Sequence, residues 1–208
     1  VDVDRAVTAA HRAFESGAWP AMTATARGKV LRKLAENIEK HAEYLAQVEV
    51  KDNGKLISEM QAQTKYMPEW YYYYGGLADK VQGSVVPVDK PDHFAYILRE
   101  PVGVCAFIVP WNSPLLLVAW KLAPALAAGC TVVIKPSEYT SASLLEFMRL
   151  VIEPLGLPPG VVNVVTGYGQ AAGEPLVTHP KVAKVAFTGG SVTGARVSSL
   201  AAQSFKKV

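Results

Sequence analysis

The sequence is 208 residues long and 50% hydrophobic, which suffices for one buried core or two small ones. Its formal net charge is +3, and the 21 Lys and Arg residues are spread along the chain without a dense basic run, so we expect no nucleic-acid partner. No stretch reaches the roughly 18 apolar residues of a membrane span, so we expect no membrane segment either.

The first third of the chain predicts helices. Apolar residues at helical spacing predict one helix that ends near Gly17 and a second whose apolar stripe covers residues 30–48. The pair Asn53-Gly54 ends the second helix, because both residues tolerate left-handed backbone. With a third helix, these elements predict an N-terminal helical segment, residues 1–82, that packs on the rest of the chain.

The third helix carries two local signals. Ser58, with Gln61 three residues later, predicts a capping box at the start of this helix. Pro68 lies inside the helical pattern and predicts a kink or a break, because proline removes a backbone donor and crowds the preceding turn.

A hairpin is predicted after the helices. Residues 85–88 and 94–99 read as two short strands, and residues 89–92 between them have turn chemistry. A lone hairpin is marginally stable in water, so we expect it to pack against another part of the protein or another subunit. We therefore interpret residues 83–103 as the hairpin of an oligomerisation region, part of which pairs with another subunit.

From residue 104 onward, strands and helices alternate four times with short links. The strands are continuous apolar runs, as expected for strands covered on both faces. This alternation predicts an α/β fold, with a Rossmann-like parallel sheet and flanking helices over residues 104–208. The predicted strands span residues 104–109, 131–135, 161–165 and 182–187, and the predicted helices span residues 115–126, 141–152 and 171–177, with a last helix from Ser191.

Ligands of such sheets bind at the carboxyl ends of the strands, so the residues after each strand carry the functional prediction. Residues 110–114, 135–138, 166–169 and 188–191 are rich in polar, charged and glycine residues, which suits a phosphorylated ligand. Residues 167–172 satisfy G-x-G-x-x-G/A, but no acidic residue ends the next strand, so we do not interpret them as a standard dinucleotide fingerprint. A glycine-fingerprint reductase is the rival class.

An acidic residue does follow the second strand of the predicted sheet. Glu138 stands where a ribose-binding carboxylate belongs, and Lys135 beside it can donate to a ribose or phosphate oxygen. A surface ion pair between the two is an equally good interpretation. The first turn, residues 110–114, has no glycine, so a nucleotide would lie differently from a typical Rossmann pose.

Five motifs resemble the aldehyde dehydrogenase superfamily, and the resemblance covers essentially the whole chain. It implies that family's fold in incomplete form, a homodimer or homotetramer, and a parent enzyme that uses NAD(P) to oxidise an aldehyde to a carboxylic acid. The oxidation would run through a cysteine thiohemiacetal and a thioester. The motifs are PWNSP at residues 110–114, KLAPALAAG at 121–129, KPSE at 135–138, PGVVN at 159–163 and FTG at 187–189.

The resemblance also implies roles for single residues. Asn112 resembles an oxyanion-hole asparagine, whose amide donates to the aldehyde oxygen as charge develops, and Lys121 resembles a lysine that helps organise the active site. Glu138 implies NAD rather than NADP, because its carboxylate repels the extra phosphate, with NADP as the alternative. The family often has a serine at the position of Gly190 that contacts the pyrophosphate of the cofactor. Gly190 has no hydroxyl, so the resemblance implies that Ser191 or backbone amides bind the pyrophosphate instead. The implied cofactor residues are Ile108, Val109, Pro110, Trp111, Lys135, Ser137, Glu138, Gly169, Gly173, Phe187, Thr188, Gly189, Gly190 and Ser191.

The nucleophilic cysteine and the water-activating glutamate of this family are expected beyond Val208. Cys105 and Cys130 are interpreted as buried structural thiols, and since they form no disulfide or metal pattern we expect a reducing cytoplasm and no bound metal. We therefore expect the chain to be part of a longer protein and inactive alone. The alternative is a truncated, non-catalytic module that binds nucleotide or oligomerises.

Overall fold

The structure is a computed structural model that describes residues 1–208. None of its helices combines the length and the apolar character needed to cross a membrane. The elements are α1 (Asp2–Glu15), α2 (Ala18–Ala21), α3 (Ala24–Asn53), α4 (Ile57–Leu77), β1 (Ser84–Val86), β2 (Ala95–Ile97), β3 (Val104–Ile108), α5 (Pro114–Ala128), β4 (Thr131–Lys135), α6 (Ala142–Phe147), β5 (Val162–Val164), α7 (Glu174–Thr178), β6 (Val182–Phe187) and α8 (Ser191–Ala202).

The predicted parallel sheet is confirmed. Its four strands lie in the order β5-β4-β3-β6, and every neighbouring pair is parallel. Phe107 of β3 is in register with Ile134 of β4 on one side and with Ala186 of β6 on the other. The chain runs from β3 outwards through β4 and β5 and then returns to the other side of β3. The gap between β3 and β6 is therefore the topological switch point of the sheet.

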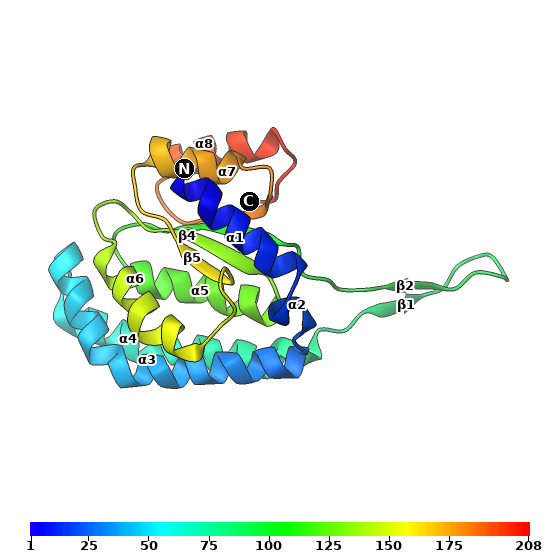
Figure 1. The fold of residues 1–208 in the computed structure, drawn as a ribbon, viewed down its shortest axis with the longest axis horizontal. Helices are drawn as coiled ribbons and strands as arrows, with labels where there is room; N and C mark the ends of the chain where they lie inside the picture. The colour runs from blue at the N-terminus through cyan, green and yellow to red at the C-terminus, as the bar shows by residue number, and fades with distance from the viewer.

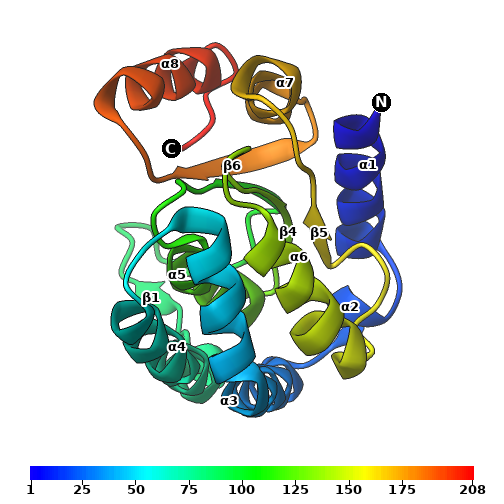
Figure 2. The same ribbon diagram turned by 90° about the vertical axis from the view of Figure 1, so that its left-hand side faces the viewer.

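Helices cover both faces of the sheet, as predicted for strands that are apolar throughout (Figure 1). The helices α3 to α6 lie on one face, and α1, α7 and α8 lie on the other (Figure 2). Each face has its own core: Cys105 and Phe107 of β3 belong to the α3–α6 core, whereas Val104 and Ala106 belong to the other. Successive residues of one strand thus serve opposite cores.

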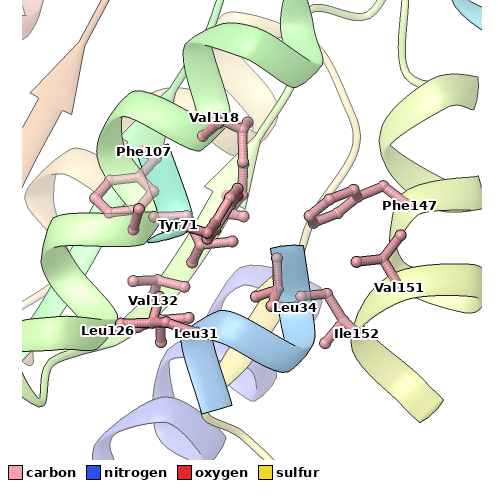
Figure 3. Close-up of a cluster of buried hydrophobic side chains, with 14 of the residues drawn as sticks. Leu31, Leu34, Tyr71, Phe107, Val118, Leu126, Val132, Phe147, Val151 and Ile152 are labelled. Atoms are coloured by element: carbon pink, nitrogen blue, oxygen red, sulfur yellow. The ribbon is translucent and has the colours of Figure 1, made fainter. Parts of the chain in front are cut away.

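The long helix α3 supplies one side of the larger core. Its residue Leu31 lies in a cluster with Tyr71 of α4 and Phe147 of α6 (Figure 3). The side chain of Thr23 caps the amino end of α3, and Gly54 ends the helix with a φ of 73°, as the Asn53-Gly54 pair predicted.

The helix α4 corrects two predictions. It begins one residue before Ser58 and no side chain caps its first turn, so the predicted capping box is wrong. Gln61 instead donates to the carboxylate of Glu43 on α3, at 2.9 and 3.0 Å, so a tertiary contact replaces the local one. Pro68 does not break the helix, because α4 packs lengthwise along α3 and this burial outweighs one missing backbone hydrogen bond.

The remaining differences lie at element ends. One helix was predicted over residues 141–152, but its second part is a π-helical turn, Met148–Ile152, and a 3-10 turn, Glu153–Leu155, follows it. A π-helical turn, Gly169–Gly173, precedes α7. The strands β1 and β2 form the predicted antiparallel hairpin, shorter than expected, and this hairpin projects away from the body of the molecule (Figure 1).

Candidate functional site

A pocket of about 430 Å³ opens at the carboxyl ends of the strands, beside the β3–β6 switch point. Its walls come from the segments after β3, β4 and β6, from the turn before α7, and from α7 and α8. Open α/β sheets bind their ligands at this position. Every residue predicted to bind a cofactor lines the pocket except Ser191, namely Ile108, Val109, Pro110, Trp111, Lys135, Ser137, Glu138, Gly169, Gly173, Phe187, Thr188, Gly189 and Gly190.

Lys135 ends β4 and is only 3% exposed. Its ammonium donates to the carbonyl oxygen of Pro136 at 2.8 Å and lies 3.6 Å from a carboxylate oxygen of Glu138. Burial lowers the pKa of Lys135, and the charge of Glu138 opposes that effect. An ammonium has three donors, so this one keeps hydrogen-bonding capacity for a ligand. Lys135 and Glu138 thus form an ion pair, and both also line the pocket. The interpretation as an ion pair and the interpretation as cofactor ligands are therefore compatible.

The opposite wall is the end of β6 and the amino end of α8. Gly189 lies against the ring of Phe187, and a Cβ at Gly189 would lie 2.6 Å from that ring and force it to shift. Gly190 precedes α8, and no side chain caps the first N–H groups of that helix. These free donors and the helix dipole favour an anionic ligand. Ser191, whose hydroxyl was expected to help, lies outside the pocket lining.

Asn112 lies in the exposed turn between β3 and α5, directly after Trp111. Trp111 lines the pocket and is 52% exposed, whereas Asn112 is not part of the lining. Further along α5, the ammonium of Lys121 donates to the hydroxyl of Thr188 at 2.6 Å, and burial lowers the pKa of Lys121. This contact ties α5 to the end of β6.

Sequence reasoning missed the α7–α8 side of the pocket. Glu174 and Arg196 line it and form an ion pair, with 2.6 Å between Nε and a carboxylate oxygen. Tyr139, also missed, lies next to Glu138 in the lining. No motif marks Glu174 or Arg196, because a helical side chain faces a pocket only through the way its helix packs on the sheet. The one available signal was the position of Glu174 directly after the glycines of the preceding turn.

The two cysteines are buried and free, as predicted, and neither lines the pocket. The contact between the two thiols lowers the pKa of Cys130 and raises the pKa of Cys105. No cluster of three or more His, Cys, Asp or Glu side chains is arranged to hold a metal ion.

The sheet order and the position of the pocket define an α/β protein with a Rossmann-like parallel sheet and a pocket at its switch point. The chain belongs to the aldehyde dehydrogenase family, whose sequence profile matches residues 1–208.

Similar proteins are dehydrogenases of greater length. The chain is 54% identical over 206 residues to (Z)-2-((N-methylformamido)methylene)-5-hydroxybutyrolactone dehydrogenase from Acinetobacter baylyi, a match that covers 99% of this chain and 42% of that protein. Betaine aldehyde dehydrogenase from Staphylococcus aureus, in complex with NAD+, matches with a TM-score of 0.95 and 42% identity over 99% of this chain and 41% of its own. The NAD-dependent aldehyde dehydrogenase from Sinorhizobium meliloti matches with a TM-score of 0.94 and 39% identity, and the match covers 100% of this chain and 41% of that protein. The chain thus spans about 42% of the length of the curated relatives it matches.

Proposed function

We propose that this chain is the cofactor-binding part of an aldehyde dehydrogenase, whose parent enzyme oxidises an aldehyde to a carboxylic acid with NAD as the preferred cofactor. The observation that carries the proposal is one pocket, at the switch point of the sheet, lined by nearly all the residues that resemble the family's cofactor ligands. Family membership and the NAD+ complex of the betaine aldehyde dehydrogenase relative support it.

The residues of the pocket fit a dinucleotide. Glu138 would accept hydrogen bonds from ribose hydroxyls, and Lys135 would donate to a ribose oxygen with the capacity its buried ammonium retains. The amino end of α8 would hold the pyrophosphate with backbone N–H groups. Because the carboxylate of Glu138 would repel a 2′-phosphate, NAD is favoured over NADP. Bound NAD+ supplies the hydride acceptor for the oxidation.

Asn112 is the residue of this chain that we assign to the reacting aldehyde. Its exposed side chain, next to the pocket-lining Trp111, would donate its amide N–H to the aldehyde oxygen. A neutral, fixed donor stabilises the negative charge that develops on that oxygen. We assign the nucleophile to neither Cys105 nor Cys130, because both thiols are buried away from the pocket.

The exchange Asn112→Ala in the parent enzyme tests this proposal. We expect kcat to fall about 100- to 1,000-fold, as when other enzymes lose an oxyanion donor. NAD affinity should change by less than about twofold, because Asn112 lies outside the cofactor pocket. NADH formation with a panel of aldehydes is the measurement. The 208-residue chain alone should form no NADH.

Two outcomes would contradict different parts of the proposal. If the unaltered parent enzyme formed no NADH with any aldehyde, the proposed activity would be wrong. If Asn112→Ala left kcat unchanged, only the role of Asn112 would be wrong, and the cofactor assignment would stand.

We further propose that the parent enzyme is a homodimer or homotetramer in the cytoplasm. The hairpin of residues 83–103 exposes large apolar side chains, with Phe94 76% and Tyr96 64% exposed, and such surfaces are typical of subunit interfaces. In this organisation residues 1–82 form a helical segment that packs on the nucleotide-binding region, residues 104–208. Two free thiols suit a reducing compartment.

A further inference from the structure

The last turn of α3, residues 49–54, contacts two strand-tip loops that are far apart in sequence. We call it the α3 terminal turn. The side-chain amide of Asn53 donates to the backbone carbonyl oxygen of Asn112 at 3.3 Å. The carboxylate of the neighbouring Asp52 accepts a hydrogen bond from the backbone N–H of Ala142 at 2.8 Å. One contact reaches the turn before α5, and the other reaches the end of the loop that begins with Lys135.

Both loops lead into helices that lack a cap of their own. Ser113 stands at the N-cap position of α5 and Ser141 at that of α6, yet neither side chain caps its helix. The hydroxyl of Ser113 instead donates to the Asn112 carbonyl oxygen at 2.8 Å. The first N–H groups of a helix need partners from outside the helix. Here α3 provides such a partner for α6 through Asp52.

Glu49 adds a third contact from the same turn. Glu49 is 2% exposed, and the backbone N–H of Leu115, in the first turn of α5, lies near enough to its carboxyl group to oppose the rise in its pKa. Its oxygen Oε1 is buried without a hydrogen-bond partner. Burying a carboxyl group is costly unless the group is hydrogen-bonded or paired. What it contacts is the start of α5, three residues after Asn112.

The α3 terminal turn is itself held firmly. Gly54 adopts left-handed backbone and its N–H donates to the carbonyl of Val50 at 2.8 Å. The side-chain oxygen of Asn53 accepts from the backbone N–H of Lys55 at 2.9 Å, which fixes the orientation of the amide that points at Asn112. A contact from a fixed turn constrains its partner loop.

We propose that the α3 terminal turn is a positioning element of the active site, in which Asn53 sets the position of Asn112 and Asp52 sets the loop from Lys135 to Ala142. The inference rests on the proposed function, because it assumes that Asn112 faces the aldehyde and Lys135 the cofactor. It assigns to an N-terminal helix, outside the Rossmann-like part of the chain, the alignment of the oxyanion donor with the cofactor loop. Asn53 and Asp52 act through other residues and need not touch either ligand.

A double-mutant cycle in the parent enzyme tests the first contact. Asn53→Asp keeps the acceptor for Lys55 but removes the donor to Asn112. We expect kcat to fall roughly tenfold, since small misplacements of catalytic groups are costly, with NAD affinity unchanged. In an Asn112→Ala background the same exchange should lower kcat by less than about twofold, because nothing is left to position.

The outcomes of this cycle separate the two levels of the proposal. Equal losses from Asn53→Asp in both backgrounds would show a general structural effect and overturn the inference while the proposed function stands. An unchanged kcat for Asn112→Ala would overturn the role of Asn112 and the inference with it. Lys51→Ala is the matched control, because Lys51 is exposed on the same turn and should have no effect on either measurement.

The second contact predicts a different readout. Asp52→Ala removes the acceptor for Ala142, and we expect the Kd for NAD, measured by fluorescence titration without aldehyde, to rise about fivefold. Asp52→Asn keeps an acceptor oxygen and should restore the affinity to within about twofold of the unaltered enzyme. An unchanged Kd in Asp52→Ala, or a loss that Asp52→Asn does not repair, would overturn this arm. If Asp52→Ala fails to fold, Asn53→Asp alone decides the proposal.

Discussion

At the scale of single residues, burial decides the protonation state of Glu49. Burial raises its pKa to about 8, and the opposing effects of the Leu115 N–H and of Lys55 are smaller. In an unfolded chain a glutamate ionises near pH 4.3. Between these values the folded protein holds a proton that the unfolded chain has released, so stability falls as pH rises through this window. The stability that this retained proton on Glu49 contributes to the fold is complete below about pH 4 and lost above about pH 8.

The exchange Glu49→Gln should flatten this pH dependence. Between pH 6 and pH 8 the unaltered protein should lose on the order of 2 kcal/mol of unfolding free energy through Glu49, and the Gln variant should lose none of that part, because an amide does not titrate. Urea denaturation at both pH values measures the difference. The two proteins differ only at Glu49, so every other pH-dependent contribution cancels in the comparison. Equal pH slopes for the two proteins would show that Glu49 is already ionised at neutral pH.

At the scale of elements, the sequence predicts what is buried on both sides and misses what depends on a distant partner. The central strand β4 matches its predicted range because a continuous apolar run specifies a strand that is buried on both faces. The capping box at Ser58 fails because Gln61 finds Glu43 on α3, a contact no local pattern contains. The same division holds for the site. Lys135 and Glu138 follow a strand and were predictable, whereas Glu174 and Arg196 depend on how α7 meets α8.

The hairpin formed by β1 and β2 is the element on which the proposed oligomer depends. Phe94 and Tyr96 lie with ring centroids 5.9 Å apart on its exposed surface. If another subunit buries them, Tyr96→Asp in the parent enzyme should weaken association at least about tenfold, since each large apolar side chain contributes roughly 1.5–3 kcal/mol on burial. Light scattering across a dilution series measures this. The control Lys33→Glu adds negative charge at an exposed site on α3 and should leave the assembly intact. Unchanged assembly in Tyr96→Asp would place the interface elsewhere.

At the scale of the whole molecule, the pocket lies where the two layers meet. One wall belongs to α7 and α8, which pack on the smaller core, and the other belongs to the loops after β3 and β4, which lead into helices of the larger core. A ligand that contacts both walls stabilises the relative position of the two layers. Cofactor binding should therefore raise the stability of the entire chain rather than order one loop.

Thermal unfolding with NAD and NADP at matched concentrations tests this coupling and the role of Glu138 together. A ligand present at about 100 times its Kd adds about 2.7 kcal/mol, which for a chain of this size raises Tm by roughly 5–10 °C. NAD should give the larger shift in the unaltered protein, because the Glu138 carboxylate repels a 2′-phosphate. Glu138→Gln removes that charge. The rise in Tm with NAD should then be smaller, and the difference between the Tm shifts with NAD and with NADP should decrease. Glu36→Gln removes an equivalent charge at an exposed position of α3 outside the pocket and should change neither shift. Equal shifts with NAD and NADP in the unaltered protein would mean that Glu138 does not face the ribose, and its contact with Lys135 would then be an ion pair and nothing more.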